Sequence, residues 1–284
     1  MGAGLRLTRA LHRCSDMVNI LTFSLCPFSK WQTELRVGSS RLQLEQWPGP
    51  KVGSGGFVWG AARRLSEYLE QHGDGCEEHS SSSLGYKGQA VGGRPWSGLN
   101  VLELGSGTGA GGLAALALGA ANVTLTDQAK FIYPSGDRKA GDLPRSLLDL
   151  MRNNASANTM GTGVSVREAS VREMLWGDDS EMINELSHST FDLVCAADVL
   201  LFEAAHEALL QTLSAVSGKA TVVLIEHTDR AGGDGQELPP DLVRFVAKAA
   251  TEGIWHTAIV RNHGRHLTLR MVRQNRDCCV EETS

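Results

Sequence analysis

The feature that most constrains the fold is a strand-like run, VLEL, that leads directly into a glycine-rich turn, GSGTGAGG. Together they span residues 101–112, and the apolar stretch 111–120 predicts a helix after the turn. The glycines of the turn allow the backbone to approach a ligand closely, because glycine has no Cβ. This order of strand, glycine turn and helix is typical of α/β proteins that bind a nucleotide-like ligand at the turn.

Apolar alternation and helical spacing predict that strands and helices alternate along the chain. The expected strands are 41–47, 99–104, 122–127, 163–169, 191–198, 220–227, 255–262 and 266–274. The expected helices are 57–71, 111–120, 143–158, 203–218 and 239–253. This pattern predicts βαβ units and a mostly parallel sheet with helices on both faces. The last two strands are too close for a crossover helix, so the last strand should be antiparallel.

Both ends of the chain and one internal segment differ in composition from this regular part. Residues 1–30 are expected to form a flexible leader, and residues 275–284 a tail. Residues 72–97 are rich in Gly, Ser and charge, which predicts a loop insertion without a core of its own. The expected organisation is therefore a single domain over residues 31–274, which is large enough to bury a sizeable core.

The composition argues against several classes of partner. The net charge of −5 shows no basic excess, so a nucleic-acid partner is not expected. The six cysteines form no CxxC pair and the nine histidines no HExxH motif, so no metal site is expected. No apolar run is long enough for a transmembrane helix, so no membrane partner is expected either. A monomer is the default expectation for the oligomeric state.

The cysteines also bear on location. A disulfide scaffold is not expected at this size, which indicates a reducing compartment and a cytoplasmic location. Residues 1–15, MGAGLRLTRALHRCS, contain three arginines and no acid. That composition fits a transit peptide, so a mitochondrial location is the alternative.

Two carboxylates help to identify the ligand of the glycine turn. Glu103 lies two residues before Gly105, where its charge would repel the pyrophosphate of NAD but would tolerate a cationic sulfonium. Asp127 ends the next strand, where it can accept hydrogen bonds from two ribose hydroxyls. The ribose role is common to NAD and to S-adenosylmethionine, so Glu103 is the residue that favours the sulfonium.

Several segments together resemble the seven-stranded methyltransferases that use S-adenosylmethionine. They resemble more closely methyltransferase family 16, a group of protein-lysine methyltransferases. The segments that carry this resemblance are VLELGSGTG, LTDQ, FDLVCAADVLLFE, GGFVWGAARRLSEYL at 55–69, LLDLMRNNASAN and LWGDD at 175–179. The resemblance extends from about residue 41 to residue 274. It implies a Rossmann-like sheet of seven strands, S-adenosyl-L-methionine as the cofactor and a protein as the substrate.

The resemblance also implies a set of cofactor-binding residues. They are Trp59, Glu103, Gly105, Ser106, Gly107, Asp127, Gln128, Trp176 and Ala197. The glycine turn would line the methionine and ribose parts of the cofactor. Trp176 would contact the adenine, Ala197 would lie beside the sulfonium, and Trp59 would close the pocket.

Asp198 is the candidate catalytic residue, because it follows the fourth strand of the expected parallel sheet, where open α/β sheets bind ligands. A carboxylate there can orient a lysine amine or relay its proton. The family motif is Asp-x-x-Tyr, or a variant with Phe, but this chain has Leu201 at the aromatic position and Phe202 after it. An arginine- or histidine-directed methyltransferase and a non-catalytic cofactor-binding scaffold are therefore alternatives, and an NAD-dependent oxidoreductase is a more distant one.

Weaker expectations concern polar residues near the ends of elements. Asn153 and Asn154 are expected to satisfy backbone groups near a helix end. Glu226 and His227 follow an expected strand near the pocket rim and are expected to cap it rather than to contact substrate. HGRH, at 263–266, is expected to be the tip of the last hairpin.

Overall fold

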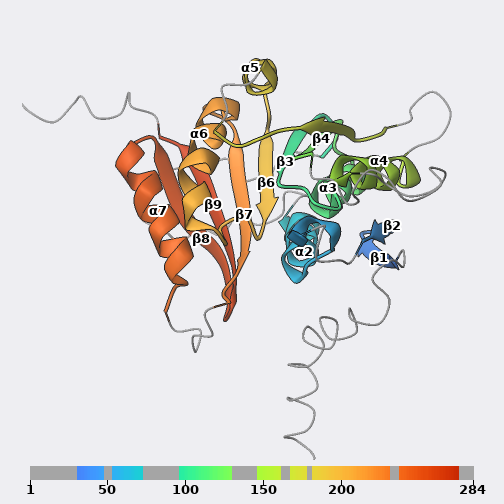
Figure 1. Cartoon of the computed structure of the whole chain (residues 1–284), viewed down its shortest axis with the longest axis horizontal. Helices are drawn as coiled ribbons and strands as arrows, with labels where there is room; N and C mark the ends of the chain where they lie inside the picture. Colours follow the sequence, from blue (N-terminus) through green and yellow to red (C-terminus); the bar gives the residue numbers. More distant parts are fainter. Residues whose placement is uncertain are drawn as a thin grey trace, which may run out of the picture.

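A central sheet with helices on both faces dominates the computed structural model (Figure 1). The structure describes residues 31–47, 53–72, 96–129, 146–160, 167–177, 181–230 and 237–274. The expected leader 1–30, the tail 275–284 and most of the insertion, 73–95, lie outside the described residues. Helix α2 continues to His72, and Trp96 is already buried in the core, so the described parts of 72–97 belong to the fold.

The elements follow one another in the order that the sequence predicts, with three additions. The strands are β1 (Trp31–Val37), β2 (Ser40–Gln46), β3 (Asn100–Leu104), β4 (Asn122–Asp127), β5 (Ser170–Glu173), β6 (Leu193–Ala197), β7 (Val222–Thr228), β8 (Trp255–His263) and β9 (His266–Arg273). The helices are α2 (Gly60–His72), α3 (Ala110–Leu118), α4 (Leu147–Ala157), α5 (Glu181–Ser187), α6 (His206–Val216) and α7 (Pro240–Glu252), with short 3-10 turns η1 (Gly53–Gly56) and η2 (Glu203–Ala205). The sequence analysis did not predict β1, η1 or α5.

Seven strands form the main sheet in the order β5-β4-β3-β6-β7-β9-β8. Strand β9 runs antiparallel to both of its neighbours, and the other pairs are parallel. The chain passes from β3 to β4 and β5, and then returns to the other side of β3 with β6. The expected fold is therefore confirmed: a mostly parallel, seven-stranded sheet with an antiparallel last strand. The reversal beside β3 creates a switch point, where such sheets bind ligands at the carboxyl ends of the strands.

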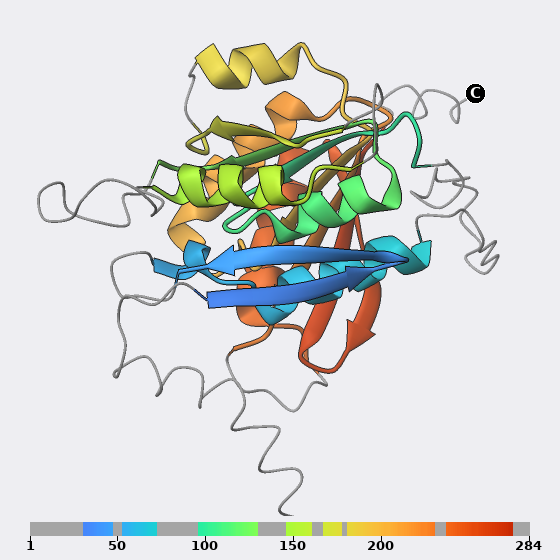
Figure 2. The ribbon, with the colours of Figure 1, turned by 90° about the vertical axis from the view of Figure 1, so that its right-hand side faces the viewer.

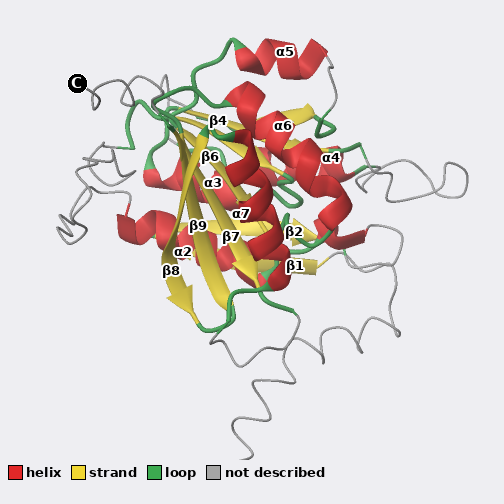
Figure 3. Ribbon diagram, turned by 90° about the vertical axis from the view of Figure 1, so that its left-hand side faces the viewer, coloured by secondary structure: helices red, strands yellow, loops and turns green. Residues whose placement is uncertain are grey.

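Helices cover both faces of the sheet because successive strand residues point to opposite sides. Val101 packs in a core with α2, α3 and α4, whereas its neighbour Leu102 packs in a second core with α5, α6 and α7. In β6, Cys195 packs in the first core and its neighbour Val194 packs in the second. Figure 3 shows the strands between the two groups of helices.

The predicted third strand of the sheet, 163–169, is wrong. Strand β5 occupies 170–173, while Arg167 forms an isolated antiparallel bridge with Met160. Residues 161–166 lie outside the described residues. The apolar alternation in GVSVREA predicted a strand in the wrong place. The real strand, β5, lies at the edge of the sheet, and because its side chains are mostly exposed it has no apolar alternation of its own. Its position is determined by its parallel register with 124–127 of β4, which no apolar pattern reports.

The hairpin of β1 and β2 forms a separate two-stranded sheet that lies against α2, α3 and α4 (Figure 2). Asn154 in α4 accepts the N–H of Glu45 at 2.7 Å and donates to the carbonyl of Glu45 at 3.1 Å. It also donates to the carbonyl of Thr108, in the glycine turn, at 3.0 Å. Asn158, at the end of the same helix, pairs in the same way with both backbone groups of Gln43. The expectation that Asn153 and Asn154 satisfy backbone groups near a helix end holds only in part, because Asn154 pairs with backbone groups of a distant strand and Asn153 is exposed.

Replacement of Asn154 by alanine should lower the free energy of unfolding by roughly 3 kcal/mol, because it leaves three buried backbone groups without this partner. The matched control is Asn153→Ala, since Asn153 is an exposed neighbour on the same helix and should change stability by less than about 0.5 kcal/mol. Urea unfolding of both variants measures the difference. Equal losses for the two variants would show that Asn154 does not hold the hairpin.

Candidate functional site

A cavity of about 400 Å³ opens at the carboxyl ends of β3, β4 and β6. Its volume lies in the range of small-molecule sites. All ten residues that the sequence analysis selected line this cavity: Trp59, Glu103, Gly105, Ser106, Gly107, Asp127, Gln128, Trp176, Ala197 and Asp198. The structure thus brings together residues that are far apart in the chain, from Trp59 to Asp198.

The glycine turn lines the cavity and has no room for a side chain at Gly105 or Gly107. Gly105 and Gly107 have φ angles of 62° and 56°, in the left-handed region that favours glycine. A Cβ on Gly105 would lie 3.1 Å from the ring of Trp176. A Cβ on Gly107 would lie 2.8 Å from the carbonyl oxygen of Gly55. These contacts explain why both positions require glycine. The first contact also shows that the Trp176 ring lies directly against the turn.

Ser106 and Asp127 fix the shape of the turn. The Ser106 hydroxyl donates to the carbonyl of Glu103 at 3.0 Å and accepts the N–H of Thr126 at 2.9 Å. Asp127 Oδ2 accepts the N–H of Gly107 at 2.9 Å, and Oδ1 accepts the N–H of Gln128 at 2.8 Å. Because Asp127 is only partly buried, its carboxylate also faces the cavity.

Glu103 is directed at the helix that follows the turn. Its oxygens accept the N–H groups of Gly111 and Gly112 at 3.1 and 2.9 Å, which satisfies the first turn of α3. A Cβ on Gly111 would overlap Glu103 Oε1, so glycine is needed there. Complete burial raises the pKa of Glu103 to about 7, although the hydrogen bonds from Gly112, Ser106 and Gly111 lower it. The charge that disfavoured a pyrophosphate in the sequence argument is therefore partly neutralised near pH 7.

Asp198 adopts an unusual backbone conformation at the end of β6. Its φ is 56°, and it is the one non-glycine residue with a positive φ in the described parts of the chain. The left-handed region costs energy for residues with a Cβ, although Asp tolerates it better than most, and such strain is concentrated at functional sites. Its N–H donates to the carbonyl of Glu226 at 2.8 Å, and its Oδ1 accepts the N–H of Thr228 at 2.9 Å. The backbone of β7 therefore holds the Asp198 carboxylate at the cavity wall.

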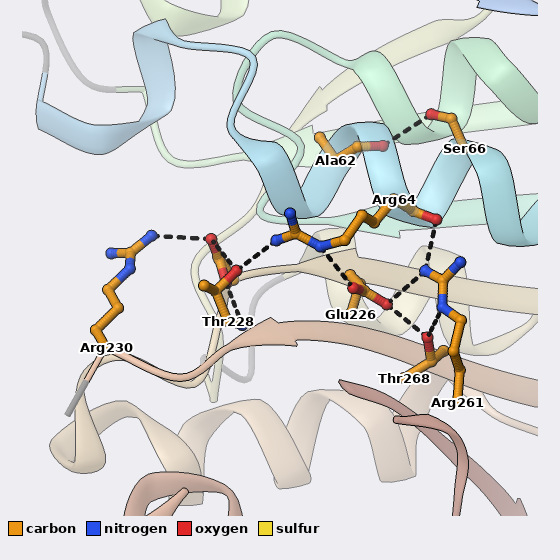
Figure 4. Close-up of polar contacts among 9 residues, drawn as sticks. Ala62, Arg64, Ser66, Glu226, Thr228, Arg230, Arg261 and Thr268 are labelled. Carbon is orange, nitrogen blue, oxygen red and sulfur yellow. Dashed lines mark hydrogen bonds and ion pairs between the residues drawn. The ribbon is translucent and has the colours of Figure 1, made fainter. Parts of the chain in front are cut away.

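A buried charged network supports this wall from behind (Figure 4). Glu226 in β7 is fully buried and forms ion pairs with Arg64 of α2 at 3.1 Å and Arg261 of β8 at 3.0 Å. It also accepts the hydroxyl of Thr268 from β9. Arg64 donates in addition to the hydroxyl of Thr228 at 2.7 Å. Since Thr228 holds Asp198, the network links helix α2 to the candidate catalytic residue.

Aromatic and apolar side chains surround the mouth of the cavity. Trp59, which is 37% exposed, packs against Phe57 with ring centroids 5.8 Å apart. Leu175 and Phe202 also line the cavity, and they are 52% and 69% exposed. Leu201 lines it as well, so both residues of the departure from the family motif are at the site. The exposed Phe202 stands at the rim, and it does not form a buried aromatic wall.

The sequence analysis missed the polar contacts of Asp198: Arg230, which lines the cavity, and Thr228 with Arg64, which support Asp198 from behind. Arg230 lines the cavity and pairs with Asp198 Oδ2 at 2.8 Å. Its position two residues after β7 was a usable signal, because residues after parallel strands converge at one edge of the sheet. Arg64 carried no such signal, since an arginine in an amphipathic helix is usually solvated.

The weaker expectations have mixed outcomes. Glu226 and His227 do not lie at the rim, because both are fully buried within β7. His227 Nε2 lies 3.2 Å from Asp241 Oδ1 at the start of α7. HGRH does form the tip of the β8–β9 hairpin. Over the residues that the structure describes, no group of side chains suits a metal ion and no helix could cross a membrane.

The raised pKa of Glu103 makes stability depend on pH in a defined direction. Between its ordinary value of 4.5 and about 7, the folded protein binds more protons at Glu103 than the unfolded chain does. Its contribution to stability therefore declines as the pH rises through this interval, by up to about 3 kcal/mol at 1.36 kcal/mol per pH unit. Glu103→Gln should lack this decline, although the amide also loses one acceptor for α3. The check is urea unfolding of both proteins from pH 4.5 to 8, and a difference that is independent of pH would contradict the assignment.

Comparison with known proteins identifies relatives of this chain. A family model described as lysine methyltransferase matches residues 38–135 and 139–237. Protein N-lysine methyltransferase METTL21A from Xenopus tropicalis is 30% identical over 224 residues, which cover 78% of this chain and 83% of the relative. The METTL21A of Danio rerio is 29% identical over 214 residues, with coverages of 75% and 78%. EEF1A lysine methyltransferase 3 from Xenopus tropicalis is 28% identical and covers 67% of this chain and 65% of its own.

Solved structures show the same fold. A SAM-dependent methyltransferase from Streptococcus mutans superposes with a TM-score of 0.51 at 12% identity, over 87% of this chain and 56% of that one. At this identity the likeness concerns the fold alone. The family match covers well over half of the chain, and it includes the glycine turn, Asp127 and Asp198. The chain belongs to the lysine methyltransferase family.

Proposed function

We propose that this chain transfers a methyl group from S-adenosylmethionine to the side-chain amine of a lysine in a protein substrate. The observation that carries the proposal is that one cavity joins the glycine turn and Asp127 to Asp198 and Trp59. The first pair suits an adenosine ligand, and the second pair suits a cationic side chain. The family match supports the same reaction.

The residues at the turn fit the cofactor. Gly105 and Gly107 leave the floor of the cavity open to close approach, and Asp127 at the end of β4 can accept from ribose hydroxyls. The ring of Trp176, which lies against Gly105, offers an apolar face for the adenine. Ala197 is small and lies beside Asp198 at the opposite wall. Glu103 contributes indirectly, because it holds the start of α3 and hence the turn.

Asp198 is the residue that would orient the target amine. When bound, S-adenosylmethionine would supply an electrophilic methyl group: the amine nitrogen would bond to the methyl carbon as the carbon–sulfur bond breaks, and the electron pair of that bond would stay on the sulfur. A lysine ammonium must first lose a proton, since its ordinary pKa is about 10.4, and Asp198 can relay that proton to solvent. Asp198 Oδ2 faces the cavity at the end of β6, where it can accept a hydrogen bond from the amine. The chain mainly positions the nucleophile, which is the main requirement of an in-line displacement.

Two further expectations stay predictions within this proposal. A cytoplasmic location is supported by the cysteine usage, and a monomer is the default state.

The exposed Leu175, Phe202 and Trp59 at the mouth supply an apolar surface on which the segment around a target lysine could pack.

Cofactor binding should depend on Asp127. Asp127→Ala removes an acceptor from the ribose site and should weaken S-adenosylmethionine and S-adenosylhomocysteine by about tenfold or more, since a hydrogen bond to a charged group contributes about 1.5–3 kcal/mol. The matched control is Glu173→Ala, because Glu173 is an exposed carboxylate opposite Asp127 in the register of β4 and β5 and does not line the cavity. Calorimetry with both ligands and with NAD is the measurement. Preferential binding of NAD would overturn the proposal.

Methyl transfer should depend on Asp198 while cofactor binding does not. With tritiated S-adenosylmethionine and a cell lysate, the wild-type chain should label proteins, and acid hydrolysis should release labelled methyl-lysine. Asp198→Asn keeps the size of the side chain and the left-handed tolerance, and it should lower labelling at least 100-fold, an order-of-magnitude figure for a lost acid–base group. Labelled methyl-arginine or methyl-histidine would support the alternative target residues. Cofactor binding without any labelling would support the non-catalytic scaffold.

A further inference from the structure

Arg230 lies at the mouth of the cavity between an anion and an aromatic ring. Its Nη2 lies 2.8 Å from Oδ2 of Asp198, and its guanidinium carbon lies 5.2 Å from the centroid of the Trp59 ring. The three groups come from different parts of the chain: before α2, after β6 and after β7. All three line the cavity. A cation of the chain itself therefore already occupies the space between the carboxylate and the ring.

These two groups are also the ones that would recognise the ammonium of a target lysine. A carboxylate forms short, charge-assisted hydrogen bonds with an ammonium, and a tryptophan face attracts a cation. Arg230 and an incoming ammonium carry the same charge. They cannot share Asp198 Oδ2 and the Trp59 face without repulsion, so one has to leave when the other binds.

The exposed fractions of the two side chains favour Arg230 as the partner that leaves. Its side chain is 42% exposed, whereas that of Asp198 is 7% exposed. Solvent screens the charge of a partly exposed guanidinium, which weakens its attraction to the carboxylate and to the ring. Asp198 Oδ1 accepts the N–H of Thr228 at 2.9 Å, a contact that does not involve Arg230. Thr228 is in turn held by Arg64, which is anchored on the buried Glu226. The carboxylate thus stays in place while the guanidinium can swing into solvent.

The geometry points to Arg230 as a specificity-determining residue that holds the place of the target ammonium until a substrate displaces it. The inference rests on the proposed function, because it assigns the acceptor side chain to the gap between Asp198 and Trp59. Arg230 then acts as a latch on the acceptor site. A cationic side chain enters only when contacts around it, such as those at the apolar mouth, offset the loss of the Arg230 pair. A lysine side chain without such contacts binds more weakly than it would in the absence of Arg230.

The test uses n-butylammonium chloride, which reproduces the end of a lysine side chain. The readout is the indole N–H signal of Trp59 in a chain labelled with ¹⁵N-tryptophan, assigned with a Trp59→Phe variant. Arg230→Gln removes the cation and keeps a side chain that is polar and extended. It should bind n-butylammonium about tenfold more tightly than the wild type, which corresponds to about 1.4 kcal/mol. Asp198→Asn should abolish the shift, which shows that the probe is bound at this site.

Two control variants separate competition from a general effect of charge. Arg230→Lys retains a cation and should bind the probe within twofold of the wild type. Arg152→Gln removes an arginine of similar exposure, 54%, which pairs with Asp149 at 3.0 Å on α4, and it should have no effect. Equal or weaker binding of the probe by Arg230→Gln than by the wild type would overturn the inference. The same holds if no variant binds the probe, or if Arg230→Lys binds it as tightly as Arg230→Gln.

The titrations are run on the free chain and on the chain saturated with S-adenosylhomocysteine. Failure of S-adenosylhomocysteine to bind would count against the proposed function, while the titration of the free chain would still test Arg230. If S-adenosylhomocysteine binds but the wild type and Arg230→Gln have the same affinity for n-butylammonium, the inference about Arg230 is rejected and the proposed function is not. Thermal unfolding of Arg230→Gln should remain close to that of the wild type, since Arg230 is exposed.

Discussion

The buried carboxylate of Glu226 is the interaction on which the arrangement of the site depends. It is fully buried, yet it is paired with two arginines from elements that are far apart in sequence, Arg64 and Arg261. Burial of an unpaired carboxylate would cost several kcal/mol, so the strand and its partners form a single unit. Arg261 also donates to the carbonyl of Arg64 at 2.7 Å and lies 5.2 Å from the ring of Tyr68. Helix α2 is therefore fixed against the β7–β9–β8 side of the sheet by charge as well as by apolar contact.

This constraint explains how a loop residue and a strand-end residue meet at one cavity. Trp59 immediately precedes α2, and Asp198 follows β6. Arg64 contacts both Glu226 and Thr228, so the helix that carries Trp59 and the strand that holds Asp198 share one anchor. On the other side of the cavity, Glu103 has the same role for α3, because a buried carboxylate orients the helix that begins at the glycine turn. The site is supported by two buried carboxylates, neither of which has to touch a ligand.

The ten selected residues of the cavity could be predicted from the sequence because most of them lie at the ends of parallel strands. Gly105, Asp127 and Asp198 each stand at or just beyond the last residue of a strand with a buried apolar run, and such ends meet at one edge. Strand β5 was misplaced for the opposite reason, since an exposed edge strand leaves no apolar pattern. The pairing of Asn154 with β2 and that of Arg64 with Glu226 depend on contacts across 109 and 162 residues. No local spacing reports contacts of that length, and the function of Glu103 at α3 became visible only with its two N–H donors.

The charge balance at the acceptor end follows from the same geometry. A carboxylate that is not shared favours a protonated lysine, because an opposite charge raises the lysine pKa, and an ammonium has no lone pair for attack. Thr228 donates to Asp198, and Arg230 contacts the same carboxylate at 2.8 Å until a substrate displaces it. Arg230 is also tethered two residues beyond β7, so it stays near the cavity after it leaves Asp198. Its positive charge then opposes the carboxylate and favours the neutral amine. The arginine that restricts entry to the site thereby also favours the loss of a proton by the amine that enters.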